Sequence, residues 1–181
     1  MAEPLDSVTD LPPVRRYITQ HNADGKSIHI ESPAQRYFPS PGAGGFAKSY
    51  SVPLPANLTD NADTKAYLEK GGPTSWDSPS VVAPSGVNLV IVDLVPGGVT
   101  PLHQTVSIDY SVVIIGEVEH ELDSGEIVKL KPGDHIVQRG TNHLWRNASK
   151  TEPARFIAST IPIEPLKVNG ELLEEKWTVP S

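Results

Sequence analysis

The stretch GGVTPLHQTVSIDYSVVIIGEVEHELDSGEIVKLKPGDHIVQRGTNHLWRN, residues 97–147, decides the fold. Its short apolar runs are separated by turn-forming sequences, which is typical of β-strands joined by tight connections. Asp123-Ser124-Gly125 predicts a hairpin, and Pro132-Gly133 fits the two central positions of a type II turn, where glycine accepts a positive φ. We therefore expect this stretch to form the greater part of a small β-barrel.

Two histidines of this stretch, His103 and His143, stand in strand-like runs that are 143 − 103 = 40 residues apart. Side chains of a strand point alternately to its two faces. If His103 faces inward, Thr105 and Asp109 share its face and Tyr110 points away, unless a bulge near Asp109 reverses the order. Hairpin connections can bring the two histidines side by side, so we expect both to face one pocket.

From the same stretch we expect Trp145 and Asn147 to share the face of His143. Glu117, Glu119 and Glu121 alternate with Val118, His120 and Leu122 and indicate the solvated face of a half-buried strand. We expect His120 and His135, which stand beside polar residues on outer strands, to face solvent.

Outside this stretch, Pro and Gly divide the chain into short pieces, which favours many strands over long helices. The full set of expected strands is 14–19, 27–31, 46–54, 86–94, 102–107, 110–115, 117–122, 126–130, 135–138, 143–146 and 155–162. The first two form an N-terminal hairpin, residues 32–45 form a loop, and Pro53 places residues 46–54 at a sheet edge. Residues 64–70 form one short helix. The pattern predicts an all-β sandwich or barrel.

Composition limits the classes of function. The chain has 181 residues, no cysteine and a net charge of −7, with 15 basic against 22 acidic side chains and no basic cluster. We expect no nucleic-acid partner, no membrane span and no secretory signal, and therefore a cytoplasmic protein. We expect a flexible arm at 1–13, a single domain at 14–165 with its motif core at 97–147, and a C-terminal tail at 166–181.

The two halves of the motif core together resemble the paired sequence motifs of the cupin superfamily. In the first motif, Gly97, His103 and Gly116 stand at the family's spacing, while Thr105 replaces a second His and Asp109 replaces a Glu. In the second motif, Pro132-Gly133-Asp134 is followed by a turn at 138–141 that is one residue short and lacks the Pro. His143 and Asn147 then complete the second motif. The segments HQTVSIDY and VQRGTNHLWRN are similar to small single-domain cupins of bacteria and fungi, often linked to natural-product biosynthesis.

This resemblance implies a double-stranded β-helix, that is a jelly-roll barrel, and usually a homodimer that packs or exchanges N-terminal strands. It also implies that His103, Asp109 and His143 occupy positions at which relatives bind one divalent metal, Fe, Mn, Ni or Zn. Thr105 is not a comparable ligand. Two interpretations stay open: a two-His, one-carboxylate metal site, or acid–base chemistry without a metal.

For catalysis the candidates are His103, Asp109, His143 and Tyr110, the last as a proton donor. For substrate binding they are Thr105, Gln138 and Trp145. The first hypothesis is an enzyme acting on a small apolar or aromatic metabolite by dehydration, decarboxylation, isomerisation or cyclisation, that is a lyase or isomerase. The second is an Fe(II)-dependent dioxygenase, and the third is a cupin that binds a small ligand without catalysis.

Overall fold

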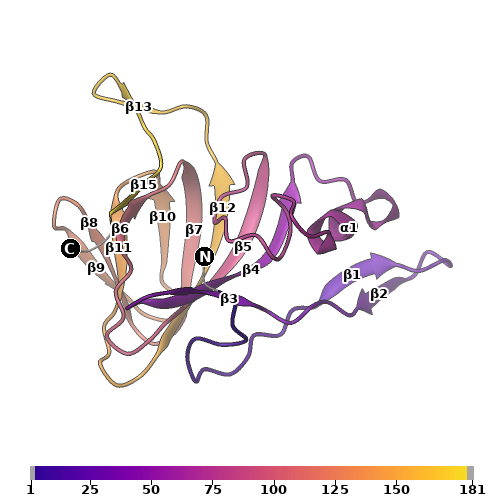
Figure 1. Ribbon diagram of the computed structural model, residues 1–181, viewed down its shortest axis with the longest axis horizontal. Helices are drawn as coiled ribbons and strands as arrows, with labels where there is room; N and C mark the ends of the chain where they lie inside the picture. The colour runs from indigo at the N-terminus through magenta and orange to yellow at the C-terminus, as the bar shows by residue number, and fades with distance from the viewer. Residues whose placement is uncertain (1–2, 179–181) are drawn as a thin grey trace.

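The computed structural model describes residues 3–178 and is built almost entirely of β-strands, with one short α-helix (Figure 1). This confirms the all-β prediction. The first eight elements in chain order are β1 (Ile18–His21), β2 (Ser27–Ile30), β3 (Tyr37–Ser40), β4 (Gly44–Pro53), a 3-10 turn (Thr59–Asn61), α1 (Ala62–Leu68), β5 (Gly86–Leu94) and β6 (Leu102–Gln104). The remaining strands are β7 (Ser107–Ile115), β8 (Val118–Leu122), β9 (Ile127–Leu130), β10 (His135–Arg139), β11 (His143–Asn147), β12 (Ala154–Pro162), β13 (Lys167–Val168), β14 (Glu171–Leu172) and β15 (Lys176–Thr178).

Two antiparallel sheets face each other. The larger has the order β10-β7-β12-β5-β4-β3, and the smaller has the order β15-β6-β11-β8-β9. Inward side chains of both pack into one core, with Val113 and Phe156 from the larger sheet and Val118 and Trp145 from the smaller. No helix in the described part of the chain has the length and apolar character that a membrane crossing requires.

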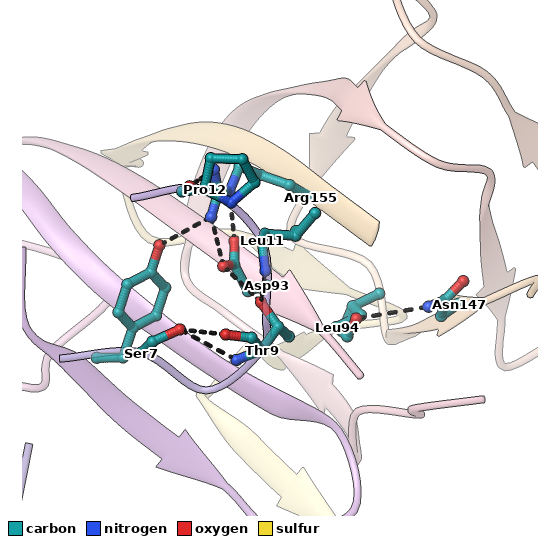
Figure 2. Close-up of polar contacts among 9 residues, drawn as sticks. Ser7, Thr9, Leu11, Pro12, Asp93, Leu94, Asn147 and Arg155 are labelled. Atoms are coloured by element: carbon teal, nitrogen blue, oxygen red, sulfur yellow. Dashed lines mark hydrogen bonds and ion pairs between the residues drawn. The ribbon is translucent and has the colours of Figure 1, made fainter. Parts of the chain in front are cut away.

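The motif core connects the two sheets. The chain leaves the smaller sheet after Gln104 and enters the larger one at Ser107, so the expected strand 102–107 is divided between them. Asn147 of β11 is buried, and its side-chain amide donates to the carbonyl oxygens of Leu94, Val95 and Glu152 at 3.4, 3.0 and 2.8 Å. Figure 2 shows the first of these bonds, which ties the end of β11 to the end of β5. The expected asparagine of the second motif therefore links the smaller sheet to the end of β5 in the larger sheet.

Two expectations for the first half of the chain were wrong. The stretch 32–45, expected as a loop, contains β3, which pairs with β4. The strand expected at a sheet edge, β4, lies inside the sheet between β3 and β5. Pro53 is compatible with that position because it is the final residue of β4, where the ladder loses only its last bond.

The N-terminal arm crosses the outer face of the larger sheet and is anchored there. Asp93 and Arg155 form a buried two-bond ion pair, with both nitrogen–oxygen distances 2.6 Å. The Thr9 hydroxyl donates to the Asp93 carboxylate, and the Arg155 guanidinium donates to the Pro12 carbonyl (Figure 2). The described part of the arm 1–13, which was expected to be flexible, is therefore anchored by this buried ion pair. Beyond it, the β1–β2 hairpin extends away from the sheets (Figure 1).

Candidate active site

A pocket of about 120 Å³ lies between the two sheets. Apolar and aromatic side chains make up most of its wall: Phe46, Val90, Val92, Leu94, Trp145 and Phe156. Its polar side chains come from both sheets and their connections: Ser40, Thr100, His103, Thr105, Asp109, Ser111, His143 and Thr160. An apolar cavity with a few convergent polar groups is the usual form of a site for small molecules.

His103 and His143 are direct cross-strand partners on β6 and β11, with ring centroids 4.3 Å apart. This confirms the expectation that they lie side by side. Nδ1 of His103 is 2.8 Å from the Pro101 carbonyl oxygen, and Nδ1 of His143 is 2.9 Å from the Thr141 carbonyl oxygen. A carbonyl oxygen only accepts, so each Nδ1 carries the proton and each Nε2 keeps a free lone pair.

Burial keeps both imidazoles neutral. It lowers the pKa of His143 to about 3, with a further contribution from the neighbouring His103. It also lowers the pKa of His103, although the bond to the Pro101 carbonyl acts in the opposite direction. At ordinary pH the two rings are hydrogen-bond acceptors or metal ligands rather than cations.

Asp109 faces the pocket from the other sheet, on β7. Its side chain is buried, and Oδ1 has no hydrogen-bond partner. Burial raises the pKa of this carboxyl from 3.8 to about 6, opposed in part by the Ser107 hydroxyl. An unpaired buried carboxyl costs stability, and groups with such a perturbed pKa are concentrated at functional sites.

A third histidine, His120, lies behind His143, and the expectation that it faces solvent was wrong. His120 is 4% exposed, and its ring stacks on that of His143 at 5.2 Å. Its Nε2 lies 3.0 Å from the Gln138 side-chain oxygen, while the Gln138 amide nitrogen donates to the Thr141 carbonyl at 2.7 Å. Since His143 donates to the same carbonyl, a continuous set of hydrogen bonds holds the two histidines in place. The alternation of His120 with the three glutamates, which do lie on the outer face, is the sequence signal for its burial.

Four further expected site residues take different positions. Thr105 and Trp145 line the pocket, whereas Gln138 is buried behind it and contacts His120 instead. Tyr110 is 49% exposed on the outer face of β7, because it follows the inward-facing Asp109 directly and no bulge reverses the order. Tyr110 therefore does not reach the pocket. Trp177 of the C-terminal tail lines the pocket and was not foreseen.

The pocket fits part of a metal site. The Nε2 atoms of His103 and His143 are suitable ligands, since imidazole binds Zn, Fe and Ni. Asp109 comes from the opposite sheet, and within residues 3–178 no three His, Cys, Asp or Glu side chains form a group able to hold a metal ion. Two imidazoles without a third ligand do not complete the expected site, so the chemistry below is derived without a metal.

Comparison with known proteins agrees with this architecture. The family model described as a cupin domain matches residues 90–160. A phomopsin biosynthesis cluster protein D of Diaporthe leptostromiformis is 42% identical over 164 residues, covering 87% of this chain and 83% of that protein. The cupin-domain-containing oxidoreductase srdB of Neurospora crassa is 34% identical over 162 residues, covering 88% and 79%.

The solved structure of the polyketide cyclase RemF from Streptomyces resistomycificus aligns over 80% of this chain and 78% of that one, with 20% identity and a TM-score of 0.47. The facing sheets and the paired motifs define the jelly-roll class of β-proteins. Within that class, this chain belongs to the cupin-domain family, and it is similar over most of its length to fungal members.

Proposed function

We propose that this protein is an enzyme of natural-product biosynthesis that acts on a small apolar or aromatic metabolite bound between its two sheets. The apolar wall of the pocket, interrupted by a few polar groups, supports this. Relatives that match most of the chain carry the names of phomopsin and oryzines biosynthesis cluster proteins, which supports the biosynthetic setting.

The reaction proposed is a proton transfer of the lyase or isomerase type: dehydration, decarboxylation, isomerisation or cyclisation. The observation that carries it is Asp109, a buried carboxyl at the pocket wall whose Oδ1 is unpaired and whose pKa is raised to about 6. A general acid or base is most effective when its pKa lies near the operating pH. Asp109 takes a proton from one atom of the substrate and returns it to another, so the carboxylate is regenerated in each cycle.

The two pocket histidines orient the substrate in this scheme. With Nδ1–H bonded to main-chain carbonyls, His103 and His143 present Nε2 as an acceptor for a hydroxyl or N–H group of the substrate. Because the imidazoles and Asp109 are on opposite sheets, a bound molecule is held on one side and exchanges its proton on the other.

The test begins with the metabolite that accumulates when the gene is disrupted, supplied to the purified protein in deuterated water. Asp109→Asn is expected to lower turnover by about 10²- to 10⁴-fold, the usual contribution of a general acid or base. The wild-type rate should titrate with a midpoint near the Asp109 pKa of about 6. Tyr110→Phe, on the outer face, serves as the control and keeps full turnover. Unchanged turnover in Asp109→Asn contradicts the proposal, and binding of the metabolite without turnover favours a ligand-binding protein.

A second candidate function is oxidation or reduction of the metabolite with a divalent metal such as iron. It is favoured by the names of four relatives, each called a cupin-domain-containing oxidoreductase. Here His103 and His143 would supply two ligands. Metal analysis of the purified protein separates the candidates, since stoichiometric metal lost in His143→Ala favours this one, whereas turnover by metal-free protein favours proton transfer.

A homodimer is part of the same proposal. Tyr110, Val112, Ile114 and Val137 are exposed together on the outer faces of the paired strands β7 and β10. The β1–β2 hairpin extends away from the barrel, and an isolated two-stranded hairpin is at best marginally stable. A second copy of the chain whose β1–β2 hairpin packs on this face would cover both the exposed apolar residues and the hairpin. Sedimentation of the wild type and of Val112→Asp tests this: the wild type should be a dimer and the variant a monomer, and a monomeric wild type contradicts it.

A further inference from the structure

The C-terminal tail places an aromatic side chain over a catalytic-site histidine. The indole ring of Trp177 is parallel to the His103 imidazole within 3°, with ring centroids 4.7 Å apart. Trp177 is the cross-strand partner of His103 and lines the pocket. It is nevertheless 50% exposed, so the described part of the chain covers only about half of this side chain.

Few interactions hold Trp177 in this position. Its strand, β15, is the edge strand of the smaller sheet and pairs with β6 through three residues. From Glu164 to Thr178 every residue except Leu173 is exposed. Further bonds join the Gln104 amide to the Glu174 carbonyl at 3.2 Å and the Leu173 N–H to the Leu166 carbonyl at 2.8 Å. Segments with so little buried surface open at low free energy.

The pocket beneath Trp177 is smaller than most ligand sites. Its 120 Å³ lies below the range of about 300–1,000 Å³ that is typical of small-molecule pockets. The wall on the His103 side is supported by neighbouring strands, since β6 lies between β15 and β11. The wall that can move is therefore the one that carries Trp177.

We propose that Trp177 and His103 form a slot that selects planar substrate rings: a flat ring of the substrate inserts between them as β15 moves outward. This inference rests on the proposed function and adds the shape of the substrate to it. In contact on both faces, an inserted ring separates the two aromatic planes to about 7 Å, twice the ~3.5 Å contact distance. The Trp177 N–H bond to Glu175, at 2.9 Å, lies within the same short segment, so it moves with the ring.

Naphthol and its saturated counterpart decahydronaphthol test the slot, because they share the carbon skeleton and the position of the hydroxyl group but only naphthol is flat. Binding is measured by titration, followed by the NMR signals of the His103 ring, in wild type, Trp177→Ala, Trp177→Phe and the control Val168→Ala. We expect the wild type to prefer naphthol. Trp177→Ala should reduce the preference by about 2- to 10-fold, the usual contribution of an aromatic pair, whereas Trp177→Phe and Val168→Ala should keep most of it.

An unchanged preference in Trp177→Ala overturns the proposal, as does naphthol binding that leaves the His103 signals in place. Circular dichroism confirms that each variant is folded. The result is independent of the catalytic assignment: Asp109→Asn, tested with the same two probes, should keep the preference for naphthol whether or not it retains turnover. A failure of the slot and a failure of the proton-transfer mechanism are therefore distinguishable.

Discussion

Replacing Asp109 by Asn should make the protein more stable at neutral and alkaline pH. In the native state burial raises the pKa of this carboxyl from 3.8 to about 6. Between pH 3.8 and about 6, the folded protein therefore holds a proton that the unfolded chain has already lost. The stability contribution of Asp109 consequently falls as pH rises. The full difference corresponds to about 3 kcal/mol at 1.36 kcal/mol per pKa unit. Asn keeps the shape of the side chain and removes the charge.

Urea unfolding of wild type and Asp109→Asn at a series of pH values measures this effect. Asp109→Asn should be more stable by up to about 3 kcal/mol near pH 8, and the difference should shrink toward zero below about pH 4. Asp93→Asn is the matched control, since Asp93 is also buried but is paired with Arg155. It should be destabilised by about 3–5 kcal/mol, the usual result of breaking a buried ion pair. A variant Asp109→Asn that is no more stable than wild type near pH 8 refutes the argument that this carboxyl is buried without compensation.

Three further outcomes follow from the contacts. Gln138→Leu should cost about 1–3 kcal/mol in urea unfolding, because the buried His120 Nε2 then lacks its acceptor. Arg155→Met should cost about 3–5 kcal/mol, because the Asp93 carboxylate remains buried without its partner, and a loss below about 1 kcal/mol would contradict the anchoring role of the pair. In an NMR titration the His143 ring should stay neutral down to about pH 4, since its pKa is lowered to about 3, and a midpoint above about 6 would show that the ring is solvated.

Most of the strand positions could be predicted from the sequence because turn residues mark the strand boundaries. The prediction of 86–94 matches β5, a long apolar run that ends at Pro96-Gly97. The prediction failed at β3, where Pro39 and the neighbouring glycines indicated a loop. Its pairing with β4 depends on tertiary contacts, since Tyr37 and Phe38 are buried by packing that local composition does not encode.

The site could be predicted where side chains alternate between the two faces of a strand. It could not be predicted where the chain passes from one sheet to the other. His103 and His143 were expected together and are cross-strand partners. The position of Asp109 on the opposite sheet depends on the break after Gln104, and no proline or glycine marks that break. Trp177 is 177 − 103 = 74 residues from His103, so only the pairing of β15 with β6 brings it to the pocket.

The division of the pocket between the sheets explains why these particular side chains can work together. Imidazoles next to a carboxylate tend to become cations that neutralise it, and its pKa then falls. Here the histidines donate to main-chain carbonyls that lie just before β6 and β11, and Asp109 lies on the larger sheet with its Oδ1 unpaired. Each group therefore keeps the ionisation state that burial imposes: neutral rings with free lone pairs, and a carboxyl that exchanges its proton near neutral pH. Asn147 ties β11 to the end of β5 and so links the sheet that carries the histidines to the sheet that carries Asp109.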